Sequence, residues 1–275
     1  MPREPARNGG ARRGWTLKQL DFEYTTHIDF DGPVINHYFT LRSLPFHSST
    51  LRVDRAHIET KPECKLAQQT DGFGNTITSG RIMDEHTFFS YSSLGSVIID
   101  LSRTEQEDPH PMFRHPSQLA TANDDIREFA HQAADAESDD NCRCEAVSHA
   151  VHEFMRYLPG TTDVRTTAQE AFSARRGVCQ DFAHITIAAL RSLGIPTRYV
   201  SGITVGEGET HAWLQANIDG YWRGFDPTRD QLVDETYLPL AVGRDWTDCP
   251  IENGSFMGMY GQHQTINASV KERIE

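Results

Sequence analysis

The sequence predicts an α+β protein, in which an N-terminal β-sandwich-like domain precedes a core of helices packed on an antiparallel sheet. Two observations lead to this class. Short segments with alternating apolar residues fill the N-terminal third, and apolar residues at helical spacing begin near residue 123. We therefore expect a flexible tail, a β domain, a linker and a core at residues 1–15, 16–105, 106–122 and 123–270, respectively.

The β domain is predicted from five segments that follow one another at short intervals. They read LDFEYTTHIDF, HYFTLRSLPF, TLRVDRAHIET, NTITSGRIMD and TFFSYSSLGSVIIDL, with Gly, Pro, Asn and Asp between them. Many short strands separated by turn residues are typical of a sandwich. The segment TDGFGNT, at residues 70–76, is predicted to be a hairpin turn. A calcium loop is disfavoured there, because the later acidic ligands are missing.

The core is predicted to contain four helices and then three strands. NDDIREFAHQAADA and SDDNCRCEAVSHAVHEFMRYL begin with Asn and Asp residues that cap helices, and TTAQEAFSARRG forms a shorter third helix. The fourth helix begins near Cys179. The strands read TRYVSGITV, THAWLQANI and GYWRGFDPT. The preceding linker is polar and contains three prolines.

Composition excludes several classes of partner. The net charge of −13 would repel nucleic acids and anionic membranes. The N-terminal MPREPARNGGARRGW lacks the apolar region of a secretory signal, and no window approaches the ~18 apolar residues of a membrane-spanning helix. The five cysteines are an odd number and do not suggest a disulfide framework. We expect a cytoplasmic protein with reduced thiols. The oligomeric state is not predicted.

Cys179 occupies the first turn of the predicted fourth helix. Gly177 lets the chain turn sharply into this helix, and Gly194 followed by proline ends it. A thiol at this position lies at the positive end of the helix dipole, beside N–H groups that can receive an oxyanion. A small buried apolar residue would fit the same local sequence. The helix alone therefore leaves both interpretations open.

His211 is the best-placed histidine to act as a base for this thiol. It begins the strand HAWLQANI, on the face opposite the aliphatic residues. His184 lies on the same helix as Cys179 but points away from it, which favours a core position. Asp226 ends the next strand, where an antiparallel pair would place it beside His211 and let it orient the imidazole. Taken alone, Asp226 is better explained as a turn cap before Pro227.

The residues of these motifs and their order along the chain resemble the transglutaminase-like superfamily, in its bacterial, papain-like cysteine-protease branch. The similar segments are RRGVCQDFAH, LRSLGIPTRYVSG, THAWLQ, FDPT and LAVGRDWTDCP, and the early β region with DGFGN resembles the bacterial N-terminal domain of that branch. The resemblance runs from about residue 16 to 270. It implies a papain-like, transglutaminase-like core after the β domain.

The resemblance also implies roles for particular residues. Cys179 would be the nucleophile, His211 the general base and acid, and Asp226 the residue that orients His211. Tyr199 and Trp213 match positions that line the family's cleft. The chemistry implied requires no cofactor and no metal, and the expected partner is a peptide or protein substrate. Cys249 stands where the branch usually has an apolar residue, with no expected catalytic consequence.

Several functions remain open at this point. The favoured one is a cysteine peptidase or amidase that forms a thioester acyl-enzyme. Transfer of the acyl group to an amine, as in a transglutaminase, would use the same three residues. Arylamine acyltransferases share their order but lack the preceding β domain. A catalytically silent peptide-binding module is another class. A zinc site at Cys142, Cys144 and His149 is disfavoured, because the spacing is not that of a zinc knuckle.

Overall fold

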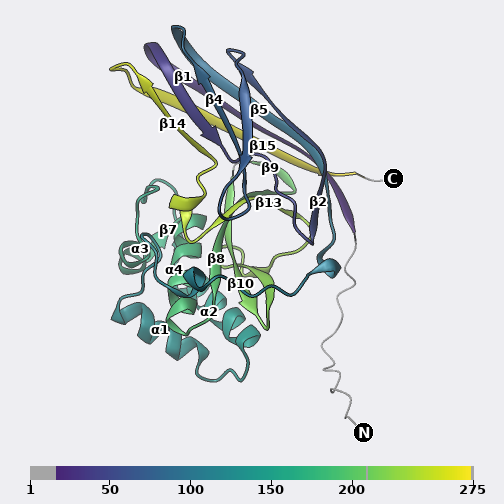
Figure 1. Cartoon of the computed structure of the whole chain (residues 1–275). Coiled ribbons are helices and arrows are strands. Elements are labelled where there is room, and N and C mark those ends of the chain that lie inside the picture. Colours follow the sequence, from purple (N-terminus) through teal and green to yellow (C-terminus); the bar gives the residue numbers. More distant parts are fainter. Residues whose placement is uncertain (1–16, 209, 274–275) are drawn as a thin grey trace.

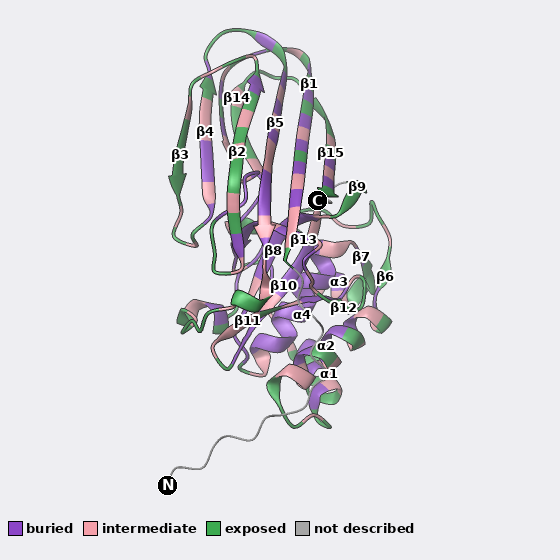
Figure 2. Cartoon of the chain, turned by 90° about the vertical axis from the view of Figure 1, so that its right-hand side faces the viewer, coloured by how far each residue is buried: buried purple, intermediate pink, exposed green. Residues whose placement is uncertain are grey.

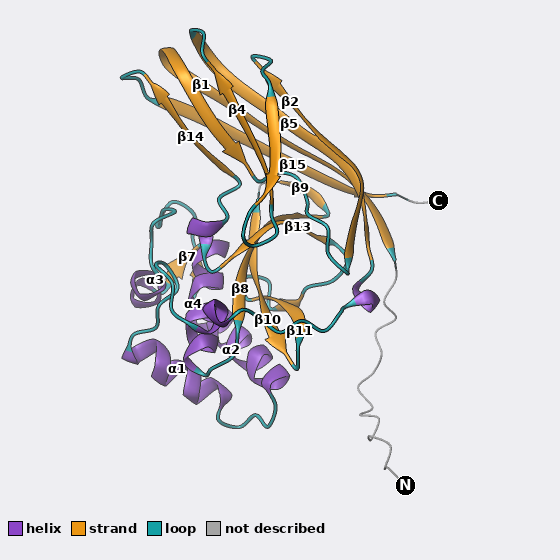
Figure 3. Cartoon of the chain, viewed as in Figure 1, coloured by secondary structure: helices purple, strands orange, loops and turns teal. Residues whose placement is uncertain are grey.

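The computed structural model describes residues 17–208 and 210–273 and confirms the α+β class. Long antiparallel strands form one end of the molecule and the helices form the other, with a smaller sheet between them (Figure 1, Figure 3). The predicted tail at residues 1–15 lies outside the described residues.

The β domain is an eight-stranded antiparallel sheet organised around one long strand, β1. Its N-terminal strands are β1 (Lys18–Leu41), β2 (Leu51–Lys61), β3 (Leu66–Thr70), β4 (Thr76–Ile82) and β5 (His86–Ile99). The first half of β1 pairs with β5, and its second half pairs with β4. Leu20, Phe22 and Tyr24 alternate with more exposed residues and face the apolar core, as the period-2 pattern predicts.

Two strands of this sheet come from the C-terminal end of the chain. They are β14 (Glu252–Met257) and β15 (Gln262–Glu272), and both pair with β1. The sequence boundaries placed these residues in the core. The structure places them in the β domain, because Ala268 and Val270 bury their side chains in its core. Pairing between residues so far apart in sequence leaves no local signal in the pattern.

The core contains the four predicted helices, packed on one face of a five-stranded sheet. The helices are α1 (Asp124–Ala134), α2 (Asp140–Phe154), α3 (Ala168–Ala174) and α4 (Cys179–Ser192). The sheet order is β12-β11-β10-β8-β13, from strands β8 (Thr197–Thr204), β10 (His211–Ile218), β11 (Tyr221–Asp226), β12 (Gln231–Leu232) and β13 (Tyr237–Gly243). Figure 2 shows α4 buried along its length, because helices cover it on one side and β8 and β10 on the other.

The helices begin where the sequence places their caps. The side chains of Asn123, Asp139 and Thr167 accept hydrogen bonds from first-turn N–H groups of α1, α2 and α3, respectively. The helix α2 ends at Phe154, before the predicted residue 158, because the chain turns into a short strand. This strand, β6 (Arg156–Tyr157), pairs in parallel with β7 (Arg176–Gly177), immediately before α4.

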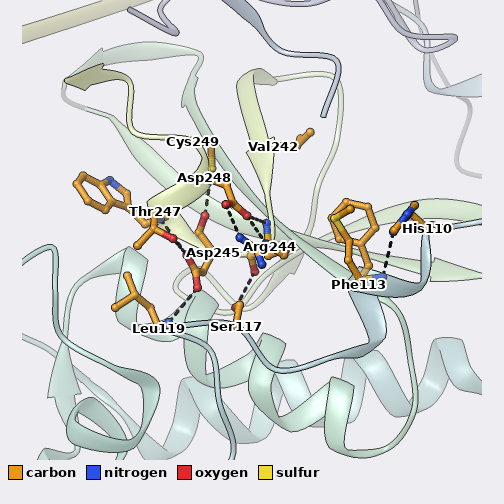
Figure 4. A network of polar contacts seen from close by, with 12 residues as sticks. His110, Phe113, Ser117, Leu119, Val242, Arg244, Asp245, Thr247, Asp248 and Cys249 are labelled. Carbon is orange, nitrogen blue, oxygen red and sulfur yellow. Dashed lines mark hydrogen bonds and ion pairs between the residues drawn. The ribbon is translucent and has the colours of Figure 1, made fainter. Parts of the chain in front are cut away.

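The segment predicted as a linker is held against the core by a buried polar network (Figure 4). The Asp245 carboxylate accepts the N–H of Leu119 at 2.9 Å. The guanidinium of Arg191, on α4, donates to the Phe113 carbonyl (3.2 Å) and to the Ser117 hydroxyl (3.0 Å). The segment also contains the short 3₁₀ helix η2 (Pro111–Arg114). Residues 106–122 are therefore part of the packed structure.

The two domains share apolar surface. Ile203 of β8 and Leu238 and Leu240 of β13 belong to the same buried cluster as the inner residues of β1. The short strand β9 (Gly206–Gly208), which follows β8, pairs with β15. The β domain therefore supports the core sheet at the end of β8, which lies beside the start of β10.

Candidate active site

Hydrogen bonds with the first turn of α4 fix the backbone immediately before Cys179. Val178 is the N-cap of α4, and its carbonyl accepts the N–H of Asp181 (2.9 Å) and of Phe182 (3.2 Å). In return, the Asp181 carboxylate accepts the Val178 N–H at 2.7 Å. A Cβ at Gly177 would collide with this carboxylate, so only glycine fits there. Cys179 is thus the first helical residue, and it is partly exposed.

His211 is the first residue of β10, opposite Gly202 of β8. Leu214 and Ala216 of the same strand belong to the buried cluster that includes α4. The alternation of β10 places His211 and Trp213 on the other face, as the sequence predicts. The imidazole therefore lies at the start of a strand whose position is fixed by pairing with β8 and β11.

The structure brings His211 and Asp226 into direct contact. The imidazole Nε2 lies 2.7 Å from Asp226 Oδ2, and the two side chains are 10% and 0% exposed. The other carboxylate oxygen, Oδ1, accepts the N–H groups of Thr228 (2.9 Å) and Arg229 (3.2 Å). Burial opposes ionisation of Asp226, but its hydrogen bonds, with His211 first among them, hold its pKa below the ordinary value. Asp226 is therefore a fixed, buried anion.

Cys179 also influences the protonation of His211. Burial disfavours the imidazolium, but hydrogen bonds with Asp226 and Cys179, together with their charges, raise the pKa of His211 to about 9. Because Nε2 is engaged by Asp226, Nδ1 is the ring nitrogen left for the thiol. Of the three residues singled out from the sequence, His211 and Asp226 are in direct contact, and Cys179 lies near enough to the ring to affect its protonation.

Tyr237 is a member of this site that sequence reasoning missed. Its hydroxyl donates to Asp226 Oδ2 at 2.7 Å and accepts from the Gln231 amide at 2.6 Å. Its ring packs edge-to-face against Trp213, with centroids 5.2 Å apart. Tyr237 comes from β13, which the sequence did not indicate as part of the site. The only local signal is its position at the start of an apolar run, ahead of Leu238.

Tyr199 and Trp213, expected to line a cleft, are buried. Tyr199 is 2% exposed and packs against His184, with centroids 4.9 Å apart. Trp213 is 1% exposed and lies beside His211 and Tyr237. A cleft-lining residue needs exposed surface, and neither side chain has it. Both support the site from the interior, because the sheet is covered on both faces.

The other candidate residues take separate positions. His184 is fully buried, as expected. Burial lowers its pKa to about 4, and its Nε2 accepts the Trp246 N–H at 3.2 Å. His149 contacts Asp230 (2.8 Å), and Cys144 is buried in the helical core. In the part of the chain that the structure describes, no three His, Cys, Asp or Glu side chains are grouped as metal ligands would be.

Comparisons with known proteins agree with this architecture. Residues 127–227 match the transglutaminase-like superfamily, and residues 20–98 match the bacterial transglutaminase-like N-terminal region. The uncharacterized protein ML0607 of Mycobacterium leprae is 30% identical over 267 residues, covering 89% of this chain and 94% of that protein. The uncharacterized protein Rv2569c of Mycobacterium tuberculosis is 40% identical over 116 residues, covering 36% of this chain and 37% of that protein.

A solved structure shares the fold over nearly the whole chain. It is described as a "putative cysteine protease" from Cytophaga hutchinsonii, and it matches with a TM-score of 0.79 at 20% identity, covering 94% of this chain and 92% of that one. Within residues 17–208 and 210–273, no helix combines the length and apolar composition that crossing a lipid bilayer requires.

The fold and the site define a two-domain α+β protein with a cysteine at a helix start and a histidine at a strand start. The chain belongs to the transglutaminase-like superfamily, and it carries the bacterial transglutaminase-like N-terminal region.

Proposed function

We propose that this protein is a thiol-dependent amide-bond hydrolase, a cysteine peptidase or amidase that acts on peptide or protein substrates. The observation that supports the proposal is the 2.7 Å contact between His211 and Asp226, together with Cys179 at the start of α4. A pKa of about 9 keeps the imidazole protonated at neutral pH, where it can hold a thiolate as an ion pair. Neither a metal nor an organic cofactor takes part in the steps proposed below.

In the first half-reaction, the Cys179 thiolate attacks the carbonyl carbon of the amide. The oxyanion accepts hydrogen bonds from the N–H groups of Cys179 and Gln180, which begin α4 and have no acceptor within the helix. The His211 imidazolium gives its Nδ1 proton to the nitrogen of the leaving amine, and the C–N bond breaks. A thioester on Cys179 and a neutral imidazole remain.

In the second half-reaction, His211 accepts a proton from water, and the resulting hydroxide attacks the thioester carbonyl. The C–S bond breaks, which releases the carboxylic acid and restores the thiolate and imidazolium. Asp226 stays ionised and fixes the ring through both steps. The sum is one amide and one water converted to one acid and one amine.

Hydrolysis and amine transfer differ only in what attacks the thioester. The description of the Cytophaga hutchinsonii structure as a cysteine protease favours water as the acceptor. Turnover of a peptide mixture in ¹⁸O-labelled water, with and without methylamine, separates the two outcomes. The hydrolase incorporates ¹⁸O into new carboxyl ends, whereas a transferase yields N-methylamides.

The first test is alkylation of the native protein by iodoacetamide at pH 6, with peptide mass spectrometry to follow each cysteine. Cys142 provides a matched control, because it also lies in the first turn of a helix, α2, and is partly exposed. A hydrogen bond with Asp139 and nearby acidic groups raise the pKa of Cys142, and no histidine activates it. We expect Cys179 to react about 100-fold faster than Cys142 at this pH.

The variant His211→Gln should remove most of this advantage, because the thiolate loses its cationic partner. Cys142 should react at the same rate in both proteins. Equal labelling of Cys179 and Cys142 in the native protein would refute the proposal and favour a peptide-binding module.

A further inference from the structure

Asp226 has a second cationic neighbour besides His211. The guanidinium Nε of Arg229 lies 3.9 Å from Asp226 Oδ2, the same oxygen that contacts His211 Nε2 at 2.7 Å. In the described part of the chain, His211 and Arg229 are the two basic side chains in ion-pair contact with this carboxylate. A buried anion, 0% exposed, is thus shared between a titratable cation and a permanent one.

The turn that follows β11 brings Arg229 back to the carboxylate. Asp226 Oδ1 accepts the backbone N–H of Arg229 at 3.2 Å, and Asp226 is the last residue of the strand. This is the kind of local hydrogen bond with which an aspartate side chain begins a turn. Arg229 therefore approaches both oxygens of Asp226, with its backbone N–H at Oδ1 and its guanidinium at Oδ2.

Two further contacts hold the guanidinium in place. Its Nη2 donates to the Thr204 hydroxyl at 3.2 Å, and its Cζ lies 5.6 Å from the centroid of the Tyr237 ring. Thr204 and Tyr237 are direct partners in the β8–β13 ladder, so both contacts come from one place in the sheet. Although the side chain is 43% exposed, three strand ends thus hold its charge beside Asp226.

The charges around Asp226 change during the proposed reaction. At rest, its negative charge faces two cations, the His211 imidazolium and the Arg229 guanidinium. Once His211 has given its Nδ1 proton to the leaving amine, the imidazole is neutral and Arg229 is the cation that remains. A buried charge that loses its partner is strongly destabilised. Arg229 therefore stabilises the thioester stage, whereas it repels the imidazolium of the resting stage.

We propose that Arg229 is a positioning residue, which keeps Asp226 ionised while His211 is neutral and promotes the release of the imidazolium proton to the leaving amine. The proposal rests on the proposed function and adds a fourth residue to it. The other titratable groups near the His211–Asp226 pair are Cys179 at the start of α4 and Tyr237 of β13. Neither supplies positive charge, so Arg229 has no substitute among the described residues.

The test is an NMR titration of His211 in the intact protein, with histidine labelled with ¹³C at Cε1. The variant His211→Gln identifies the signal by its absence. In Arg229→Gln, the imidazolium loses a repelling neighbour, so the midpoint of the titration should rise, by about half a pH unit for a half-exposed charge. The imidazolium then releases its proton about threefold less readily. Arg229→Lys keeps the charge and should restore the midpoint of the native protein.

The sign of the shift separates the proposed role from a merely structural one. If Arg229 only held the turn, Arg229→Gln would loosen Asp226, and the midpoint of His211 would fall. Thr204→Val frees the guanidinium but leaves its charge. It should give a smaller rise, and it keeps the test decisive if Arg229→Gln fails to fold. Arg127→Gln is the matched control, because Arg127 pairs with Asp124 at the same spacing of three residues on exposed α1. It should leave the midpoint unchanged.

The consequences for turnover follow from the same shift. Hydrolysis of the peptide mixture should fall about threefold in Arg229→Gln and return in Arg229→Lys. A midpoint that falls or stays the same in Arg229→Gln, with Cys179 still alkylated faster than Cys142, would overturn the role of Arg229 and leave the proposed function standing. Equal alkylation of the two thiols in the native protein would overturn both.

Discussion

Each domain contains a largely buried, hydrogen-bonded histidine, yet the pKa values of the two are shifted in opposite directions. In the core, contacts of His211 with Asp226 and Cys179 outweigh burial and raise its pKa to about 9. In the β domain, His37 is 4% exposed, and its Nδ1 lies 3.3 Å from Nε2 of His86. Burial, with the charge of His86 as a second cause, lowers the pKa of His37 to about 4.

The difference shows that the hydrogen-bond partner of a buried histidine, more than its depth of burial, decides the protonation state of the ring. His86 Nδ1 lies 2.9 Å from the Asp84 carbonyl, which can only accept, so this nitrogen donates and Nε2 is left as the acceptor for His37. Such a pair offers a neutral acceptor to a neutral ring. Asp226 instead offers a negative charge. The β domain therefore keeps His37 uncharged at neutral pH, whereas the core keeps His211 as a cation ready for proton transfer.

The largest effect is expected when the core site is made to resemble the β-domain site. Asp226→Asn replaces the anion by a neutral amide of the same shape, so the pKa of His211 should fall. Amide hydrolysis should decrease by about 1,000-fold, equivalent to about 4 kcal/mol of activation free energy. NMR titration of His211, together with kcat/KM, checks both statements. A variant that retains its hydrolytic rate would exclude an orienting role for Asp226.

The β-domain pair predicts an intermediate effect on stability at acid pH. The folded-state pKa of His37 is about 4 and the unfolded value is about 6.5. The unfolded chain therefore binds the proton first as the pH falls. The stabilisation is present above pH 6.5 and is lost progressively between pH 6.5 and 4, by up to about 3 kcal/mol.

Urea unfolding at pH 7 and at pH 4.5 measures this loss, with His37→Gln for comparison. Carboxylates titrate in both proteins, so the difference between them isolates His37. The variant should be less stable at pH 7 and should lose less stability on acidification. The same loss in both proteins would show that the pair is not pH-sensitive.

The smallest effect concerns the tyrosine that shares the Asp226 oxygen with His211. Tyr237→Phe removes one donor from Asp226 and should lower kcat/KM by about tenfold, because the carboxylate is less firmly held. The remaining contact with His211 should strengthen, so the alkaline limb of the pH–rate profile should move to higher pH. Gln231→Ala, which leaves the tyrosine hydroxyl in place, should shift the profile less. An unmoved alkaline limb in Tyr237→Phe would indicate a purely structural role.

The comparison also separates what the sequence could predict from what it could not. The positions of Cys179 at a helix start, His211 at a strand start and Asp226 at a strand end could be predicted, because these boundaries have local signals. Tyr237 and the pair of His37 and His86 had no such signal, since their contacts join segments that only the folded sheets bring together. The assignment of β15 failed for the same reason, although its inward residues alternate as those of a strand should.

The pairing of β1 with β15 has a consequence for how the protein is made. Lys18, near the start of the described chain, forms an ion pair with Glu272 near its end (2.9 Å). During synthesis, the first half of β1 can pair with β5 early, but its other edge has no partner until β15 has left the ribosome. The helices of the core can form earlier, but β9 and the end of β8 gain their support only after β15 has been made. A nascent chain truncated before residue 262 would leave this edge of β1 unpaired, and an unpaired strand edge favours association with other chains.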